Sequence, residues 1–152
     1  MKVRKATIDD INEIADLYIE QFCIMKDLQP DFYQEGEQSK AFIQGVIESD
    51  DSDILVLTDN AIVGLALLQT KETPDFPFFV KHKYAYLMDI VMTKDCRGKG
   101  MGSILLEEAK KWAIDRELEY VELDVLSGND NAIRFYRKHG FMDKKHLMFC
   151  KL

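Results

Sequence analysis

A glycine-rich stretch in the second half of the chain has the residue types of an anion-binding turn. Its residues are Arg97, Gly98, Lys99, Gly100, Met101, Gly102 and Ser103. Glycines let successive backbone N–H groups point outward without obstruction by side chains, and a helix N-terminus adds free N–H donors and a partial positive charge. If a helix begins within this stretch, it is suited to bind a phosphate or pyrophosphate.

The flanking sequence predicts the elements that position this turn. Tyr86 to Met92 is apolar enough for a buried strand. After the glycines, Met101, Leu105, Ala109 and Trp112 recur at helical spacing and mark one apolar face. The local order is therefore strand, glycine-rich turn and helix.

Known phosphate-binding glycine patterns differ in spacing. No window has the two glycines followed by Lys and Ser or Thr that a P-loop requires. The dinucleotide fingerprint G-x-G-x-x-G lacks its third glycine, which is replaced by Ser103, although Asp124 lies about where a ribose-binding acid would be. A dinucleotide-binding domain therefore remains an alternative.

A third pattern, R/Q-x-x-G-x-G/A, is matched completely by residues 97–102. It resembles the acetyl-CoA-binding motif of the GNAT family of N-acetyltransferases. A second family-like run follows about 30 residues later and consists of Asn129, Ala132, Phe135, Tyr136, Gly140 and Phe141. The resemblance covers the region from Tyr84 to Phe141 and implies one N-acetyltransferase domain over residues 1–152.

The resemblance also implies the fold class, an α/β (mixed α+β) domain. Its central sheet would be mixed, mostly antiparallel and splayed between the fourth and fifth strands, with about four flanking helices. The sequence patterns agree with this layout. They predict strands at Val3–Ala6, Asp53–Thr58, Ala61–Thr70, Tyr86–Met92, Tyr120–Leu126 and Lys145–Cys150, with Asp59 and Asn60 as the turn of a hairpin between the second and third of these. Helices are predicted after Thr7, at Gln38–Glu48, after Met101 and at Asn131–His139.

By this resemblance, acetyl-CoA is the cosubstrate and a primary amine attacks it directly in a ternary complex. The backbone of Ile90, Val91 and Met92 would pair with the pantetheine arm and polarise the thioester carbonyl. Residues 97–103 would hold the pyrophosphate, and Asn129 would steady the cosubstrate or cap a helix.

The resemblance assigns Tyr136 as the acid that protonates the departing thiolate, because a phenol is protonated at neutral pH. A base must also remove a proton from the amine. Asp89 is the first candidate and Glu122 the second, although Met88 stands where family members often carry an acid. If no base is present, a noncatalytic acyl-CoA-binding module on the same fold is the alternative.

Composition restricts the partners. The 152 residues carry a net charge of −7, which disfavours nucleic acid and favours a cationic amine acceptor. No apolar run is long enough to span a membrane, and the N-terminus lacks the pattern of a signal peptide. We therefore expect a cytoplasmic protein with reduced cysteines, no metal site and no membrane partner.

Two regions bear on the acceptor and on assembly. The aromatic loop from Glu72 to Phe79 could line a substrate lid, form a dimer contact or fold onto the core. A homodimer is possible through this loop and an edge strand. The candidate acceptor contacts, each of which could instead be a core residue, are Phe22, Met25, Phe32 and Tyr33.

Overall fold

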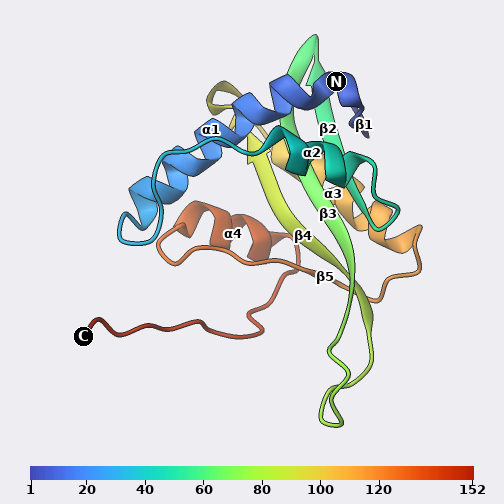
Figure 1. Cartoon of the computed structure of the whole chain (residues 1–152), viewed down its shortest axis with the longest axis vertical. Helices are drawn as coiled ribbons and strands as arrows, with labels where there is room; N and C mark the ends of the chain where they lie inside the picture. The colour runs from blue at the N-terminus through green and yellow to red at the C-terminus, as the bar shows by residue number, and fades with distance from the viewer.

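A five-stranded sheet forms the centre of the computed structural model, which describes residues 1–152 (Figure 1). The strands lie in chain order across the sheet, and only β4 and β5 run parallel. Their bounds are β1 Lys2–Lys5, β2 Ser52–Asp59, β3 Ala61–Glu72, β4 Lys83–Met92 and β5 Val121–Glu122. The predicted mixed, mostly antiparallel sheet is confirmed, and the single parallel pair rules out the doubly wound sheet that a dinucleotide-binding domain would need.

Helices cover both faces of this sheet. The α-helices are α1 Ile11–Leu28, α2 Lys40–Ile47, α3 Met101–Ile114 and α4 Asp130–Lys138, and the short 3₁₀ helices are η1 Ile8–Asp10 and η2 Lys94–Cys96. The helices α1 and α2 pack on one face and α3 on the other. None of these helices combines the length and apolar character needed to cross a membrane.

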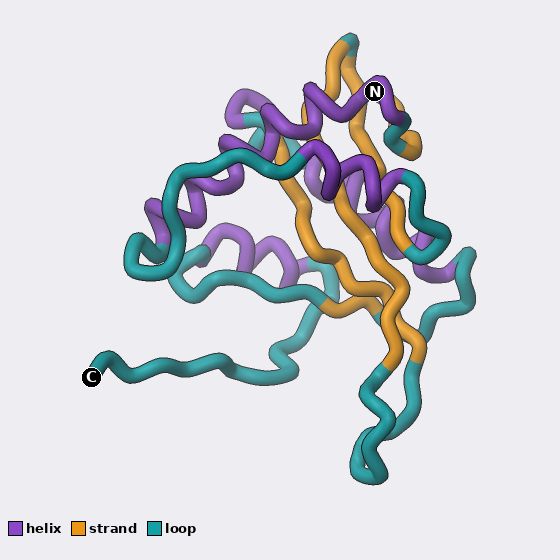
Figure 2. The backbone as a smooth tube through the Cα atoms, in the orientation of Figure 1, coloured by secondary structure: helices purple, strands orange, loops and turns teal.

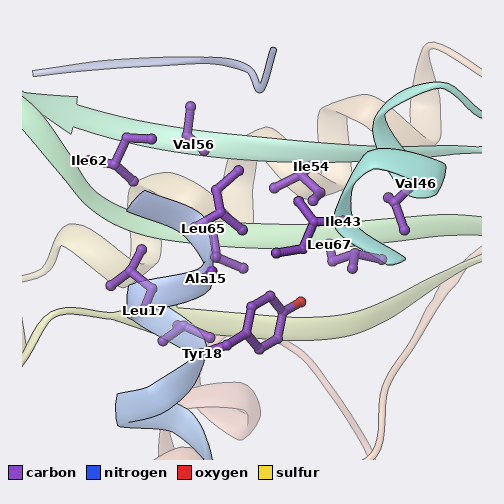
Figure 3. Close-up of a cluster of buried hydrophobic side chains, with 12 residues drawn as sticks. Ala15, Leu17, Tyr18, Ile43, Val46, Ile54, Val56, Ile62, Leu65 and Leu67 are labelled. Atoms are coloured by element: carbon purple, nitrogen blue, oxygen red, sulfur yellow. The ribbon is translucent and has the colours of Figure 1, made fainter. Parts of the chain in front are cut away.

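The first core layer lies between the sheet and the α1–α2 pair (Figure 3). Ile14 and Tyr18 of α1 and Ile43 of α2 are fully buried against it. The strands supply Ile54, Val56, Ile62, Leu65, Leu67 and Val91. Each large apolar side chain buried in this way contributes about 1.5–3 kcal/mol.

The second core layer lies between the opposite face of the sheet and α3. Its buried members are Leu55, Leu57, Ala66, Leu68, Ala85, Leu87, Leu105, Leu106, Ala109, Trp112 and Ala113. The predicted apolar face of α3 is therefore confirmed, since Leu105, Ala109 and Trp112 all point into this layer. Phe135 and Tyr136 of α4 pack against its margin.

A β-bulge in β4 decides which side chains face which layer. Leu67 of β3 pairs with Asp89, whereas the next residue, Leu68, pairs with Leu87, so Met88 has no partner opposite it. Before the bulge, Ala85 and Leu87 face α3. After it, the alternation is shifted by one residue, and Asp89 lies on the α1 face, beside Tyr18.

The predicted hairpin between β2 and β3 is confirmed. Asn60 connects Asp59 to Ala61 with φ of 66°, the left-handed conformation that Asn tolerates in tight turns.

Two strand predictions near the C-terminus are wrong in extent or in kind. The predicted Tyr120–Leu126 strand is reduced to Val121–Glu122, because the chain leaves β4 after these two residues. Residues 145–150, predicted as a final strand, are extended but pair with no other strand of the chain. The sequence of side chains can favour an extended backbone, but a β-strand also requires a neighbouring backbone with which to form hydrogen bonds.

An ion pair fixes the start of α1 against β1. The Asp10 carboxylate accepts hydrogen bonds from Arg4 at 2.6 and 2.8 Å and from the Thr7 backbone N–H at 2.7 Å. Hydrogen bonding to Arg4, the largest cause, lowers the pKa of Asp10 to about 2 from its usual 3.8.

We expect Asp10→Asn to lower the free energy of unfolding at pH 7 by about 1–3 kcal/mol, because hydrogen bonds to charged groups are lost. Since the folded pKa is depressed, the stabilisation is complete above the unfolded pKa and is lost as the pH falls from 3.8 toward 2. Urea unfolding across this pH range measures the difference. Asp9→Asn, at an exposed neighbouring position, is the control, and an unchanged difference from pH 7 to pH 2 would contradict the assignment.

Candidate active site

The glycine-rich turn adopts a backbone conformation that favours glycine. Gly98 and Gly100 have φ of 71° and 79°, a left-handed conformation in which an L side chain is strained. Gly100 is the residue before α3, so the helix begins inside the motif. A side-chain carbon at either glycine would meet no neighbour within 4 Å, so these glycines are required by backbone conformation and not by packing.

The N–H groups of residues 98–102 donate to no acceptor in the protein. They lie at the N-terminus of α3, where the helix adds a partial positive charge. Ser103 differs, because its N–H already donates to the Gly100 carbonyl at 3.1 Å and only its hydroxyl is free. A row of free N–H donors at a helix start is suited to bind an anion.

The Arg97 side chain connects this turn to two other elements. Its Nε donates to the Met92 carbonyl at the end of β4 at 2.9 Å, and its Nη2 donates to the Glu20 carboxylate of α1 at 2.8 Å. The same Glu20 oxygen accepts the Lys94 backbone N–H at 3.1 Å. Glu20 therefore holds the start of the turn, a role that sequence analysis missed because no local pattern links positions 77 residues apart.

β4 has one edge without a neighbouring strand next to this turn. It pairs with β3 along its whole length but with β5 only at Ala85 and Tyr86. From Leu87 to Met92, the edge facing β5 therefore has no partner strand. This stretch contains Ile90, Val91 and Met92, whose backbone the sequence analysis assigned to the site.

Asp89 is the carboxylate that the bulge places between β4 and α1. Its Oδ2 accepts a hydrogen bond from the Tyr18 hydroxyl at 2.9 Å. Burial raises the pKa of Asp89, and the Tyr18 hydrogen bond opposes that rise. A carboxylate with a raised pKa takes up a proton more readily than an ordinary aspartate, which suits a general base.

Two other acidic residues, Glu122 and Asp124, lie where β5 diverges from β4, and each already has a partner within the protein. Glu122, the second candidate base, is paired with Lys144. Asp124 accepts the Tyr86 hydroxyl at 2.8 Å. Asp89 therefore stays the first candidate base and Glu122 the second.

Tyr136 lies on α4, beyond the opening between β4 and β5. Asn129 caps this helix, since its side chain accepts the Ala132 N–H at 3.2 Å. The Tyr136 ring packs on Phe135 and Phe141, with centroids 5.4 and 5.6 Å away. Burial, with the negative charge of Asp89, raises the pKa of Tyr136, so its hydroxyl stays protonated at neutral pH. That hydroxyl makes no hydrogen bond within the protein.

The candidate acceptor residues fall into two environments. Phe22 packs on Tyr18 with ring centroids 5.7 Å apart and joins the first core layer. Phe32, in contrast, is 54% exposed in the loop after α1. Met25 and Tyr33 are half-buried. The core interpretation therefore applies to Phe22, while Phe32 faces solvent.

The aromatic loop does not fold onto the core. It forms the tip of the β3–β4 hairpin, which projects from the body of the molecule (Figure 2). Phe76 and Phe78 stack at 5.7 Å, Phe78 and Phe79 lie 4.9 Å apart, and Phe78 remains 80% exposed.

One mixed α/β domain thus carries the glycine-rich turn with its free N–H groups, the open β4 edge, the half-buried Asp89 carboxylate and the protonated Tyr136. Comparison with known proteins identifies the family. The model of the "Acetyltransferase (GNAT) family" matches residues 11–141. This chain belongs to that family.

Individual relatives agree with this assignment. The chain is 26% identical over 137 residues to a protein named as an N-acetyltransferase from Archaeoglobus fulgidus, covering 90% of this chain and 89% of the relative. The crystal structure of the tetramutant of the BH1408 protein from Bacillus halodurans matches with a TM-score of 0.95 at 25% identity, covering all of both chains. The aminoglycoside N-acetyltransferase AAC(6')-Iy, solved in complex with CoA, has the same fold, with a TM-score of 0.77, 11% identity and coverage of 99% and 98%.

We expect Tyr18→Phe to raise the pKa of Asp89 further, because the removed hydrogen bond stabilises the charged carboxylate. A ¹³C NMR titration of the aspartate carboxyl carbons measures the shift. Tyr33→Phe removes a hydroxyl that makes no hydrogen bond and serves as the control. An Asp89 pKa that stays the same or falls in Tyr18→Phe would show that the hydrogen bond does not stabilise the charged form.

Proposed function

We propose that this protein transfers the acetyl group of acetyl-CoA to a primary amine by direct attack in a ternary complex. One observation carries the proposal: the open backbone edge of β4 is followed closely in the chain by the free N–H groups of the glycine-rich turn. The open edge of β4 runs to Met92, whose carbonyl accepts the Arg97 Nε, and the free N–H groups of residues 98–102 begin a few residues later. One extended ligand with a peptide-like arm and a pyrophosphate would use both.

The turn would hold the pyrophosphate through backbone N–H groups, which explains why glycines are needed there. The positive charge of Arg97 lies beside it, although Glu20 partly neutralises that charge. The edge from Leu87 to Met92 would pair with the pantetheine arm as an added strand does. A free N–H on this edge would polarise the thioester carbonyl and stabilise the charge that develops on its oxygen.

Asp89 would act as the general base and Tyr136 as the general acid. Asp89 accepts the proton that the amine must lose, either directly or through a water molecule. The amine nitrogen forms a bond to the carbonyl carbon as the carbon–sulfur bond breaks. Tyr136 donates its proton to the departing thiolate, whose ordinary pKa is well below that of a phenol; a catalytic tyrosine must then regain a proton from solvent.

The acceptor proposed is a small cationic amine. The net charge of −7 attracts a cation, and Asp89, Glu122 and Asp124 all lie near the divergence of β4 and β5. The aminoglycoside named for the structural neighbour AAC(6')-Iy is an amine of this kind. A noncatalytic acyl-CoA-binding module is the alternative. Both hypotheses predict acetyl-CoA binding, but only the enzyme would release CoA in the presence of an amine.

We expect Gly100→Asp to weaken acetyl-CoA binding by about 100-fold or more, because it strains a left-handed position and places a carboxylate among the anion-binding N–H groups. Isothermal titration calorimetry with acetyl-CoA measures this. Gly140→Asp is the matched control, since Gly140 has a similar φ of 87° and open surroundings outside the turn.

Two further titrations, of Tyr136→Phe with acetyl-CoA and of the wild type with NAD(H), test whether the site is specific for acetyl-CoA. Tyr136→Phe should retain acetyl-CoA binding, and NAD(H) should not bind the wild type. Failure of the folded wild type to bind acetyl-CoA, or preferential binding of NAD(H), would overturn the proposed function.

We expect Asp89→Asn to reduce kcat by about 10²- to 10⁴-fold, the usual contribution of a general base, while acetyl-CoA still binds. In the wild type, kcat/KM should fall as the pH drops through the raised Asp89 pKa, and this acidic limb should disappear in Asp89→Asn. Release of CoA thiol with ornithine, spermidine or an aminoglycoside as acceptor provides the assay. Asp124→Asn is the control for the acidic limb. A wild-type pH profile in Asp89→Asn would assign the base elsewhere.

A further inference from the structure

A lysine of the C-terminal segment lies against two tyrosines at the starts of β4 and β5. The Tyr84 and Tyr120 rings stack with their centroids 4.9 Å apart and an angle of 10° between their planes. The Lys144 Nζ lies over both rings, 5.8 Å from the Tyr84 centroid and 5.3 Å from the Tyr120 centroid. The same ammonium pairs with the Glu122 carboxylate. Two aromatic rings and one carboxylate therefore contact a single cation, as in sites that recognise organic ammonium groups.

The Lys144 side chain is held only weakly in this place. It is 65% exposed, whereas the Glu122 side chain is 27% exposed. Exposed ion pairs and exposed cation–π contacts each contribute little to stability. Residues 142–152 also take part in no backbone–backbone hydrogen bond. Lys144 can therefore turn into solvent without disrupting the backbone, while Glu122 stays in place on β5.

A pocket adjoins Lys144 beside the β3–β4 hairpin. It has a volume of about 400 Å³ and is lined by Thr73, Phe79, Val80, His82, Tyr120 and Lys144. Phe79 and Val80 are 41% and 70% exposed and offer apolar surface. This volume is within the range of small-molecule sites. Because Lys144 and Tyr120 belong both to the pocket and to the cation contact, displacement of the lysine side chain would join the pocket to Glu122.

This pocket is separate from the proposed site of acetyl transfer. Tyr84 lies five residues before Asp89, which is roughly 15 Å along a strand. The pocket includes no residue of the glycine-rich turn or of the open β4 edge. A ligand bound there would therefore not be in reach of the proposed base.

We propose that Tyr84, Tyr120 and Glu122 form a binding site for a small organic ammonium ion, and that Lys144 occupies this site in the free protein. The ammonium group of the ligand takes the place of the Lys144 Nζ, and its alkyl groups contact Phe79 and Val80. Lys144 is thus an internal competitor that lowers the affinity for an external cation.

The other acid near this pocket already has a partner. Glu119 lies 2.9 Å from the Nδ1 of His82, and it also accepts the Lys83 backbone N–H at 2.8 Å. The His82 ring packs edge-on against Tyr120, with centroids 5.5 Å apart. His82 and Glu119 therefore fix one wall of the pocket, and Glu122 is the carboxylate that the ligand meets.

An NMR titration with choline, without acetyl-CoA, tests the proposal. The amide signals of Tyr84, Tyr120 and His82 in the ¹⁵N-labelled full chain should shift with choline. They should not shift with 3,3-dimethyl-1-butanol, which has the shape of choline but no charge. Because acetyl-CoA is absent, the result does not depend on whether the protein transfers acetyl groups.

We expect Lys144→Ala to tighten choline binding by about 3- to 10-fold, because the internal cation is removed. Lys145→Ala is the matched control, since it removes the same charge from the next, exposed position, and it should bind choline as the wild type does. Tyr120→Leu and Glu122→Gln, each added to Lys144→Ala, should weaken binding by about threefold or more. Glu122→Gln keeps the side-chain shape, so it tests the site even if Tyr120→Leu does not fold.

Three outcomes would overturn the proposal. If choline leaves these amide signals unchanged in Lys144→Ala, no cation site exists beside the tyrosines. If Lys145→Ala tightens binding as much as Lys144→Ala, the effect comes from net charge and not from an internal competitor. If the neutral alcohol binds as well as choline, the pocket recognises apolar groups and not a cation.

Discussion

The divergence of β5 from β4 after Tyr86 is the constraint on which the candidate site depends. While two strands stay paired, their backbone groups satisfy each other, and no ligand can use them. Because pairing stops after two residues, β4 keeps an unpaired edge from Leu87 to Met92 in the middle of a folded sheet. The same divergence limits β5 to Val121–Glu122.

The bulge at Met88 determines what chemistry can take place at that edge. Without the extra residue, Asp89 would continue the alternation of Ala85 and Leu87 and point at the apolar layer beneath α3, where an ionised carboxylate would be very costly. The bulge turns it to the α1 face, where Tyr18 supplies a hydrogen bond. Partial burial raises the pKa of Asp89, and its charge in turn helps to keep Tyr136 protonated. The acid and the base of the proposed reaction are thus coupled through one irregularity in β4.

The helix α1 has a part in both halves of the site. Tyr18 contacts the proposed base, and Glu20, two residues further on, holds Arg97 and the Lys94 N–H at the start of the glycine-rich turn. Since the apolar stripe of α1 is buried in the first core layer, the packing of this helix fixes the position of both polar side chains. A small shift of α1 would therefore change the environment of the base and of the turn together.

The sequence by itself determined the features that depend on local backbone conformation. The glycine-rich stretch predicted a turn before a helix, Asp59 and Asn60 predicted the hairpin, and the spacing of Leu105, Ala109 and Trp112 predicted the buried face of α3. Each of these follows from the conformational freedom or periodicity of a few neighbouring residues, which no distant contact has to supply. The complete motif at residues 97–102 and the second motif predicted the family, and the resemblance to that family implied the mixed sheet.

Tertiary structure alone decided the features that depend on partners far apart in the chain. The face that Asp89 occupies depends on the register between β3 and β4. The role of Glu20 depends on contacts with residues more than 70 positions away. The predicted strand at 145–150 also depends on a distant partner. Its residues favour an extended backbone, but a strand forms only where a neighbouring backbone offers hydrogen bonds. No other strand of this chain pairs with these residues.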